Sequence, residues 1–201
     1  MEEKMARKRV DTERRVQIVE ALHKCLIVKS FNETSIKDIA AEAGVNHGVL
    51  HYYFSSKEEI LLTYIDYIID LYKEQYAQWL AERDGKISAD RQFIIDIFTF
   101  MRERITLNKN LSKVFIEIWE IGSYNKKVRA KLQKAYGEWI QNVSEIIGKK
   151  ISNKKTIDIM SRALVAYFEG MALFSIIMPP GDFHASEILA WVEDYVIKGM
   201  D

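Results

Sequence analysis

Proline is nearly absent from this chain, and its placement limits the possible folds more than any other sequence feature. The 201 residues contain only two prolines, adjacent at Pro179 and Pro180. Because proline is the residue that most strongly interrupts a helix, residues 1–178 can form successive helices separated only by turns. Strand-like alternation is scarce, and the β-branched residues lie within helical patterns. The sequence therefore predicts an all-α protein.

Apolar residues spaced three and four apart locate the helices. The first expected helix covers Asp11–Lys29, and Ile18 and Leu22 lie on its buried side. We expect an N-terminal three-helix domain, residues 1–55, and a C-terminal helical bundle, residues 56–201. The further expected helices are Ser35–Glu42, Asn46–Tyr53, Ser56–Arg83, Ser88–Thr106, Lys109–Ile121, Lys126–Gly148, Lys154–Met178 and Ala185–Lys198.

The second and third expected helices are separated by a tight turn at Ala43–Val45. Gly44 suits the left-handed backbone that closes a helix, and the small Ala40 lets the two helices cross closely. Ile39, Val45 and Leu50 can hold the pair together. This arrangement is typical of a helix-turn-helix, whose second helix is free to enter a major groove of DNA.

A recognition helix presents its first residues to base edges and its flanks to the phosphate backbone. This rule places Asn46, His47, Gly48 and Val49 near bases, and His51, Tyr52 or Tyr53 near phosphates. Gly48 has no side chain, so the helix backbone could approach the duplex closely at that point.

The stretch from Thr34 to Lys57 resembles the tetracycline-repressor (TetR) family of bacterial transcriptional regulators. The similarity rests on Thr34-Ser35-Ile36, Asp38-Ile39-Ala40, Ala43-Gly44-Val45, Gly48-Val49-Leu50, and Tyr53-Phe54 before Ser56-Lys57-Glu58-Glu59. Several positions match in order, so the resemblance is specific. It implies phosphate contacts from Thr34, His51, Tyr53 and Lys57, and contacts at or near bases from His47, Gly48 and Val49. It also implies a dimer, an all-helical ligand-binding body, and repression that a small molecule relieves.

This chain departs from the usual family residues at four positions of the motif. Asn46 replaces Ser or Thr, and it is an equally good N-cap. His47 replaces Lys or Arg, which weakens charge-based contact at neutral pH. Val49 replaces Thr and offers a methyl contact to thymine but no hydrogen bond, and His51 replaces Tyr. The full set predicted to contact DNA is Thr34, Ser35, Asn46, His47, Gly48, Val49, His51, Tyr52, Tyr53 and Lys57.

The body is rich in large apolar side chains, most of which must form its core. An excess of aromatic residues and methionines also suits a pocket for a small apolar or aromatic effector, because such pockets are mostly hydrophobic. The candidate lining residues are Phe98, Met101, Phe115, Trp119, Trp139 and Phe168.

The last two expected helices carry apolar stripes that predict a dimer surface. Bulky and small residues alternate along one side of the first, as close helix crossings require. In the family that the chain resembles, these helices pair with their twofold mates, which sets two reading heads about 34–36 Å apart on a palindromic operator. An intrachain core is the alternative for the same residues. The predicted interface consists of Leu164, Phe168, Met171, Ser175, Leu189, Val192 and Val196.

Composition narrows the class of protein. Hydrophobic residues make up 48% of the chain and charged residues 29%, which is typical of a soluble globular protein. Apolar stretches such as Met171–Pro180 are shorter than the ~20 residues that cross a bilayer, and the N-terminus is charged, so we expect a cytoplasmic protein. A single cysteine, Cys25, precludes an internal disulfide or a thiolate metal cluster. The net charge is zero, and residues 1–57 carry ten Lys and Arg against eight Asp and Glu.

Two other functions are compatible with a helical chain. The N-terminal domain, residues 1–55, could instead be a packing unit in a helical ligand-binding or interaction protein. Its near-zero net charge, and His47 in place of Lys or Arg, would favour this alternative. The body could be an enzyme, but no phosphate-binding glycine loop, paired metal-binding histidines or serine-centred elbow is present. Glu117 and Glu120 lie three residues apart, a spacing more typical of a solvated face. We therefore expect no catalysis, no cofactor and no metal site.

Overall fold

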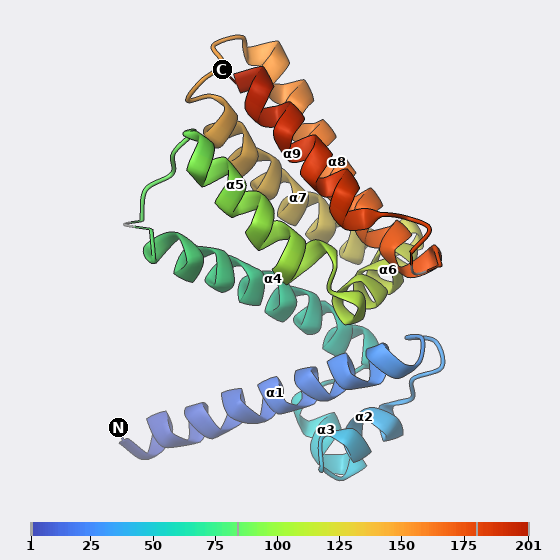
Figure 1. Ribbon diagram of the computed structural model, residues 1–201. Helices are drawn as coiled ribbons and strands as arrows, with labels where there is room; N and C mark the ends of the chain where they lie inside the picture. The colour runs from blue at the N-terminus through green and yellow to red at the C-terminus, as the bar shows by residue number, and fades with distance from the viewer. Residues whose placement is uncertain (1, 84, 180, 201) are drawn as a thin grey trace. The chain divides into compact units, whose positions relative to one another are not determined.

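The computed structural model describes residues 2–83, 85–179 and 181–200, and the side chains of residues 10–83, 85–179 and 181–199. The described residues form helices joined by turns and loops, which confirms the all-α prediction. Figure 1 shows α1 (Glu2–Val28), α2 (Ile36–Glu42), α3 (His47–Tyr53), α4 (Lys57–Ala81), α5 (Arg91–Phe100), α6 (Lys109–Tyr124), α7 (Lys126–Ile147), α8 (Lys154–Ile177) and α9 (Ala185–Met200); the π-helical segment η1 (Met101–Thr106) directly follows α5.

Side-chain caps fix the starts of several helices. The Asp90 carboxylate accepts the Phe93 amide hydrogen at 2.9 Å before α5, and the Asn153 side chain accepts that of Thr156 at 3.1 Å before α8. Before α4, the Ser56 hydroxyl accepts the Glu59 amide hydrogen at 3.1 Å. Such caps satisfy amide groups that have no partner within the helix.

Helix α1 is longer than the sequence indicates. The apolar periodicity begins near Asp11, but the backbone is helical from Glu2. The sequence before Asp11 is mostly charged and has no apolar periodicity, so hydrophobic spacing could not detect this part of the helix. The basic run Arg7-Lys8-Arg9 falls within α1, and its side chains lie outside the described ones.

The first compact unit comprises residues 1–74 and 117–131. Ile18 and Leu22 of α1 are fully buried there, together with Ile39 of α2 and Leu50 of α3. Tyr64 of α4 is also fully buried, and its hydroxyl lies 2.7 Å from Nδ1 of His23 on α1. The start of α4 therefore packs as part of the same unit as the three N-terminal helices.

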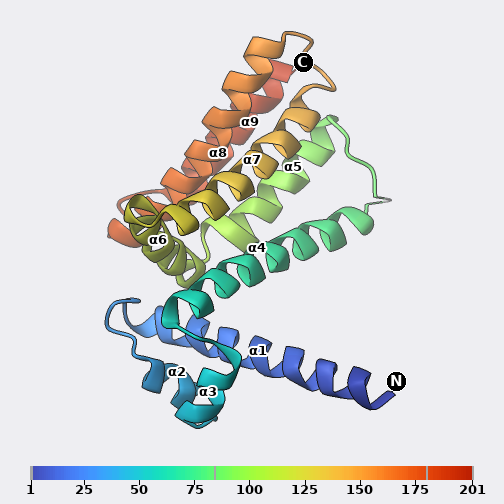
Figure 2. The same cartoon turned by 180° about the vertical axis from the view of Figure 1, so that it is seen from behind.

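The second compact unit comprises residues 75–116 and 132–201. Within it, α5, α8 and α9 run alongside one another and alongside α7 (Figure 2). Its core contains Trp79, Phe93, Phe98, Phe168 and Leu189. This division by packing differs from the functional boundary at residues 55 and 56 predicted from the sequence, which stays a prediction.

Segment η1 interrupts the single helix expected over Ser88–Thr106. The Leu107 amide donates to the Arg102 carbonyl oxygen at 3.1 Å, five residues back, so the last turn is wider than an α-helix. Met101 and Thr106, at the two ends of η1, are both buried. Wide turns of this kind are frequently found at functional sites.

By length and composition, α8 alone among the described helices could cross a membrane. One such helix is weak support for a membrane span, because a core helix of a soluble protein passes the same test. Val165, Phe168 and Met171 of α8 are buried in the second unit. One side of α8 therefore belongs to the core of the second unit.

Candidate nucleic-acid interface

Helix α3 has one buried and one exposed side. Asn46 is its N-cap, and its side-chain oxygen accepts the Val49 amide hydrogen at 2.8 Å, as the sequence predicts. Leu50 is fully buried beneath the helix. The opposite side exposes His47, Gly48, Val49, His51 and Tyr52, the residues predicted to face bases and phosphates.

Two side chains dominate the exposed side of α3, one turn apart. The rings of His47 and His51 meet edge to face, with centroids 4.4 Å apart. Between them, Gly48 leaves the backbone uncovered, and a Cβ atom there would meet only the Asn46 side-chain oxygen at 3.4 Å. The fold therefore does not require glycine at position 48.

The turn before α3 has the expected geometry. Gly44 adopts φ +62°, in the left-handed region that glycine favours. The Val45 amide donates to the Ala40 carbonyl oxygen at 3.0 Å, which brings the chain back across the end of α2. Ile39 and Ala40 are buried at the helix crossing. The turn at Gly44 and the close helix crossing at Ala40 both agree with the sequence prediction.

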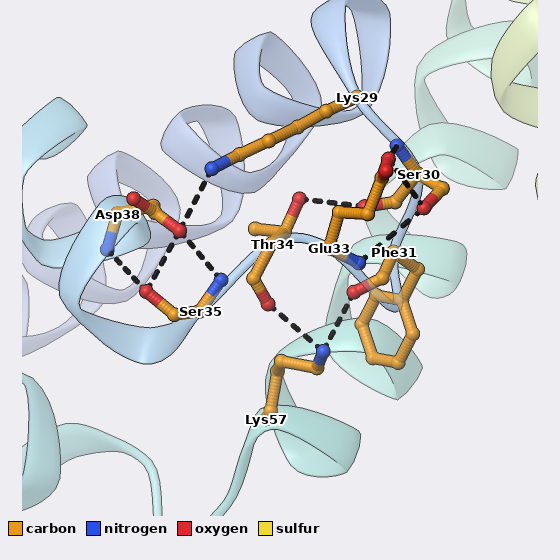
Figure 3. Close-up of polar contacts among 8 residues, drawn as sticks. All are labelled: Lys29, Ser30, Phe31, Glu33, Thr34, Ser35, Asp38 and Lys57. Atoms are coloured by element: carbon orange, nitrogen blue, oxygen red, sulfur yellow. Dashed lines mark hydrogen bonds and ion pairs between the residues drawn. The ribbon is translucent and has the colours of Figure 1, made fainter.

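Ser35 starts α2 through a reciprocal cap. Its hydroxyl accepts the Asp38 amide hydrogen at 3.1 Å, and the Asp38 carboxylate accepts the Ser35 amide hydrogen at 2.7 Å. Lys29 lies 2.8 Å from the same carboxylate (Figure 3). Its hydrogen bond, with those of Ser35, holds the pKa of Asp38 well below its ordinary value. The Ser35 side chain is thus hydrogen-bonded within the N-terminal domain.

Tyr53 closes α3 against α1. Its hydroxyl donates to the Asp11 carboxylate at 3.3 Å, and burial with the nearby Asp11 charge raises the pKa of Tyr53. The Arg15 guanidinium donates to the Tyr53 carbonyl oxygen, lies 4.1 Å from the centre of the Phe54 ring and contacts the Glu59 carboxylate at 3.3 Å. These contacts fix the end of α3 relative to α1.

Lys57 and Thr34 are turned toward the protein (Figure 3). Nζ of Lys57 donates to the carbonyl oxygens of Phe31 at 2.6 Å and Thr34 at 2.9 Å, and lies 4.1 Å from the centre of the Phe31 ring. Burial lowers the pKa of Lys57. The Thr34 hydroxyl donates to the Ser30 carbonyl oxygen at 2.9 Å, and the residue is 1% exposed. Their predicted phosphate contacts stay predictions.

Glu117 has a structural role that sequence reasoning missed. Its carboxylate accepts the Phe31 amide hydrogen at 2.7 Å. Nearby, the Glu58 carboxylate accepts a hydrogen bond from Asn125 at 2.8 Å and contacts Lys127 at 3.3 Å. These contacts span at least 67 residues of sequence, so spacing gave no signal for them. Glu117 therefore anchors the loop before α2, which differs from the solvated face expected of it.

The structure groups some of the predicted ligand-binding residues. The Phe98 and Phe168 rings lie 5.3 Å apart, Trp139 stacks 6.5 Å from Phe168, and Met101 is buried in the same core cluster. Trp119 belongs to the first compact unit, unlike the other five predicted residues. This grouping does not identify a ligand, and the pocket stays a prediction.

Most residues of the predicted dimer surface point into the chain. Phe168, Met171, Leu189 and Val196 are buried core residues, and Leu164 and Val192 pack against them, while Ser175 is half-buried. The apolar side chains that α8 and α9 expose are different ones. They are Ile159, Phe174, Ile177, Trp191 and Tyr195.

Among the residues with described side chains, no group of three or more His, Cys, Asp or Glu could hold a metal ion.

Comparisons with known proteins agree with this interface. Residues 18–64 match the family model described as bacterial regulatory proteins, tetR family. The regulator BetI 1 of Chromohalobacter salexigens is 23% identical over 184 residues, which cover 91% of this chain and 88% of that protein. Other relatives of this chain are also named as HTH-type transcriptional regulators.

Two solved structures share the fold at low sequence identity. A transcriptional regulator from Saccharomonospora viridis in complex with choline has a TM-score of 0.77 and 21% identity, covering 92% of this chain and 96% of that one. The regulator FadR of Bacillus subtilis in complex with stearoyl-CoA has a TM-score of 0.72 and 16% identity, covering 92% of this chain and 99% of that one.

Proposed function

We infer that this chain, which belongs to the TetR family of DNA-binding transcriptional regulators, is a homodimeric repressor whose hold on a palindromic operator is released by a small molecule. The observation that carries this proposal is the exposed side of α3, where His47, Gly48, Val49 and Tyr52 face outward over a fixed helix-turn-helix. Binding to operator DNA fits a cytoplasmic location.

The proposed groove contact uses α3 from its N-terminal end. His47, Gly48 and Val49 lie near base edges, while His51 and Tyr52 reach the backbone. Tyr53 and Lys57 fix the helix in place through their contacts with Asp11 and with the loop before α2. Because Thr34, Ser35 and Lys57 already have intrachain partners, their hydroxyl and ammonium groups contribute mainly by shaping the docking surface.

The proposed dimer forms through α8 and α9. Ile159, Phe174 and Ile177 lie on one exposed face of α8. On α9, Trp191 and Tyr195 are 67% and 69% exposed and stack with centroids 5.8 Å apart. A surface of this apolar character is expensive to leave in water, and a second copy would cover it symmetrically. The small residues Ala163, Ala166 and Gly170 continue the α8 face and permit close helix approach.

The proposed effector binds within the second unit. The hydroxyls of Tyr76, Thr106 and Tyr167 are buried there without a hydrogen-bond partner in the described structure. Buried polar groups are normally satisfied, so these three suggest space for a polar ligand group or ordered water. Thr106 is the last residue of segment η1, so the wide π turn includes one of these three residues. Choline and stearoyl-CoA, bound by the two structural relatives, differ too much to set the effector's identity.

Helices α4 and α6 belong to both compact units and are the proposed route from effector to DNA. The N-terminal part of α4 and the C-terminal part of α6 lie in the first unit, and the remainder of each lies in the second. Glu117 of α6 holds the Phe31 amide, and Lys57 of α4 holds the Phe31 carbonyl oxygen. An effector can change DNA affinity only by binding two arrangements of these helices unequally.

A mobility-shift assay with DNA from upstream of the chain's own gene tests the proposal. We expect retention that weakens steeply with salt, because bound phosphates release counterions. Footprinting should protect two half-sites about 10 base pairs apart, centre to centre. Tyr52→Ala should weaken retention, whereas Tyr124→Ala, an exposed tyrosine of α6 in the same unit, should not. Protection of one half-site would contradict the dimer, and absence of retention would contradict binding of the chain to an operator at its own gene.

A further inference from the structure

Helix α3 exposes two histidines whose rings contact each other. His47 and His51 are both exposed, and their ring centroids are 4.4 Å apart with the ring planes at 73°. Among the residues with described side chains, neither ring has a hydrogen bond or an ion pair. The ring nitrogens of this histidine pair are therefore open to water, to protons and to a bound molecule.

The charged side chains of α1, which packs against α3, already have partners on the protein. The Asp11 carboxylate accepts the Tyr53 hydroxyl hydrogen, and Arg14 donates to a glutamine of its own helix. Arg15 contacts the Tyr53 carbonyl oxygen and the Glu59 carboxylate. The charged residues of α1 that have such partners are Asp11, Glu13, Arg14, Arg15, Glu20 and Lys24.

The acids of α2, which also packs against α3, are paired with cations. Asp38 lies 2.8 Å from Lys29, and Glu42 lies 3.2 Å from Lys24. The remaining charge on this helix is the exposed Lys37. Within the described residues, the histidine pair therefore has no acidic partner, and an anion outside the chain can supply one.

We propose that the histidine pair couples operator binding to pH, because docked DNA holds His47 and His51 in their protonated, cationic form. Histidine is the side chain whose charge changes between pH 5 and 8, and duplex DNA is a dense line of negative charge. Two imidazolium charges side by side repel each other in the free chain, and the phosphates offset that repulsion. This inference rests on the proposed function, because it adds the proton as a signal acting on the same interface.

Proton uptake gives the pH dependence a defined sign. Each ring that is neutral in the free chain takes one proton from the solvent when DNA docks. Affinity then rises as the pH falls, by up to about tenfold per pH unit for each proton taken up. Binding also becomes more sensitive to salt at low pH, because each imidazolium displaces counterions from the phosphates. A lysine at the same position would give neither effect, since its charge is constant over this range.

Mobility shifts at pH 6 and pH 8, on DNA from upstream of the chain's own gene, test the coupling. At fixed salt, we expect the affinity at pH 6 to exceed that at pH 8 tenfold or more. The slope of log affinity against log salt should be steeper at pH 6 by at least about one. Calorimetry in phosphate and in Tris, whose heats of ionisation differ, counts the protons taken up at pH 7. Uptake near zero, or equal affinity at both pH values, would overturn the inference.

Variants assign the protons to α3. The His47→Gln, His51→Gln double variant should bind at pH 6 no more tightly than the parent does at pH 8. His47→Lys carries a permanent charge, so it should bind more tightly than the parent at pH 8 and depend less on pH. His184→Asn is the control, because it replaces an exposed histidine outside α3 and tolerates its φ of +46°. This control should keep the pH dependence of the parent.

Two other groups are alternative sources of a pH effect. Burial raises the pKa of Glu169 on α8 to about 7, and burial lowers the pKa of His23 on α1. If the pH dependence persists in the double variant, folded by circular dichroism, the histidine pair does not carry it and the inference is wrong. The measurements on the parent need no variant and remain decisive if the double variant fails to fold.

The same mobility shifts separate this inference from the proposed function. Retention with equal affinity at pH 6 and pH 8 would remove the coupling and leave the DNA-binding regulator intact. Absence of retention at either pH would overturn the proposed function, and the coupling with it.

Discussion

Nζ of Lys57 and the carbonyl oxygen of Thr34 are 2.9 Å apart, so two residues predicted to hold DNA phosphates are bonded to each other. The ammonium group spans from α4 to the loop before α2 and also caps the Phe31 carbonyl oxygen. The Lys57 ammonium group therefore stabilises the folded protein even in the absence of DNA.

Lys57→Ala should therefore lower the stability of the free protein. Loss of two hydrogen bonds from a charged donor, leaving two carbonyl oxygens without that partner, should cost about 2–3 kcal/mol of unfolding free energy. Urea unfolding measured at a fixed protein concentration checks this value. Lys37→Ala, at an exposed position of α2, is the control and should change stability by less than about 0.5 kcal/mol. A Lys57→Ala variant as stable as the parent would show that Lys57 serves DNA alone.

Gly48→Ala should separate folding from DNA binding. A Cβ atom has room at this position, and alanine favours a helix over glycine by up to about 1 kcal/mol, so stability should hold or rise. Operator affinity should fall about tenfold or more, because the methyl group stands between the α3 backbone and the duplex. Thermal unfolding and mobility shift on the same sample provide both readouts. Retained affinity would mean that α3 does not approach DNA at Gly48.

Ile177→Asp should convert the proposed dimer to a monomer. The side chain is 63% exposed in the single chain, so the substitution should hardly affect folding but should place a charge within the apolar α8 face. Sedimentation velocity measures the change in mass. Val28→Asp, at a position 84% exposed on α1, is the matched control and should remain dimeric. Dimeric Ile177→Asp protein would exclude this face as the interface.

Glu169→Gln should change how stability depends on pH. Because the folded pKa of about 7 lies above the ordinary value of 4.5, the acid's contribution is fully present below pH 4.5 and is lost as the pH rises through 7. The variant should match the parent near pH 4.5 and exceed it by about 2–3 kcal/mol at pH 8. Urea unfolding at several pH values checks this trend. A pH-independent difference would mean that Glu169 titrates as an exposed acid does.

The helix-turn-helix could be predicted because residues close together in sequence determine its main features. Gly44 needs a left-handed backbone, and Asn46 needs only the amide three residues on, so neighbouring residues determine both features. The Lys57 contact with Phe31 crosses 26 residues of sequence, and the Glu117 contact crosses 86. Hydrophobic spacing and helix propensity depend only on residues that are close in sequence. They therefore could not predict that Lys57 points toward the protein.

Helix α8 shows a second limit of sequence reasoning. Phe168 and Phe174 are both large aromatics on the same helix, yet one is buried and the other is 47% exposed. When a helix is apolar on two sides, its periodicity does not reveal which side meets its own chain. The wide turn at η1 is similar, because the apolar spacing of Ser88–Thr106 fits one continuous helix and gives no sign of a π turn.

The bond from Glu117 to the Phe31 amide has a consequence for protein engineering. A chimera that grafts residues 1–74 onto a foreign sensor would carry the whole recognition motif but discard the acid that anchors the loop before α2. Such a graft should read its operator poorly until the donor segment 117–131, or an equivalent acid, is transplanted with it. The part that would have to be transferred therefore consists of two segments that are far apart in the sequence.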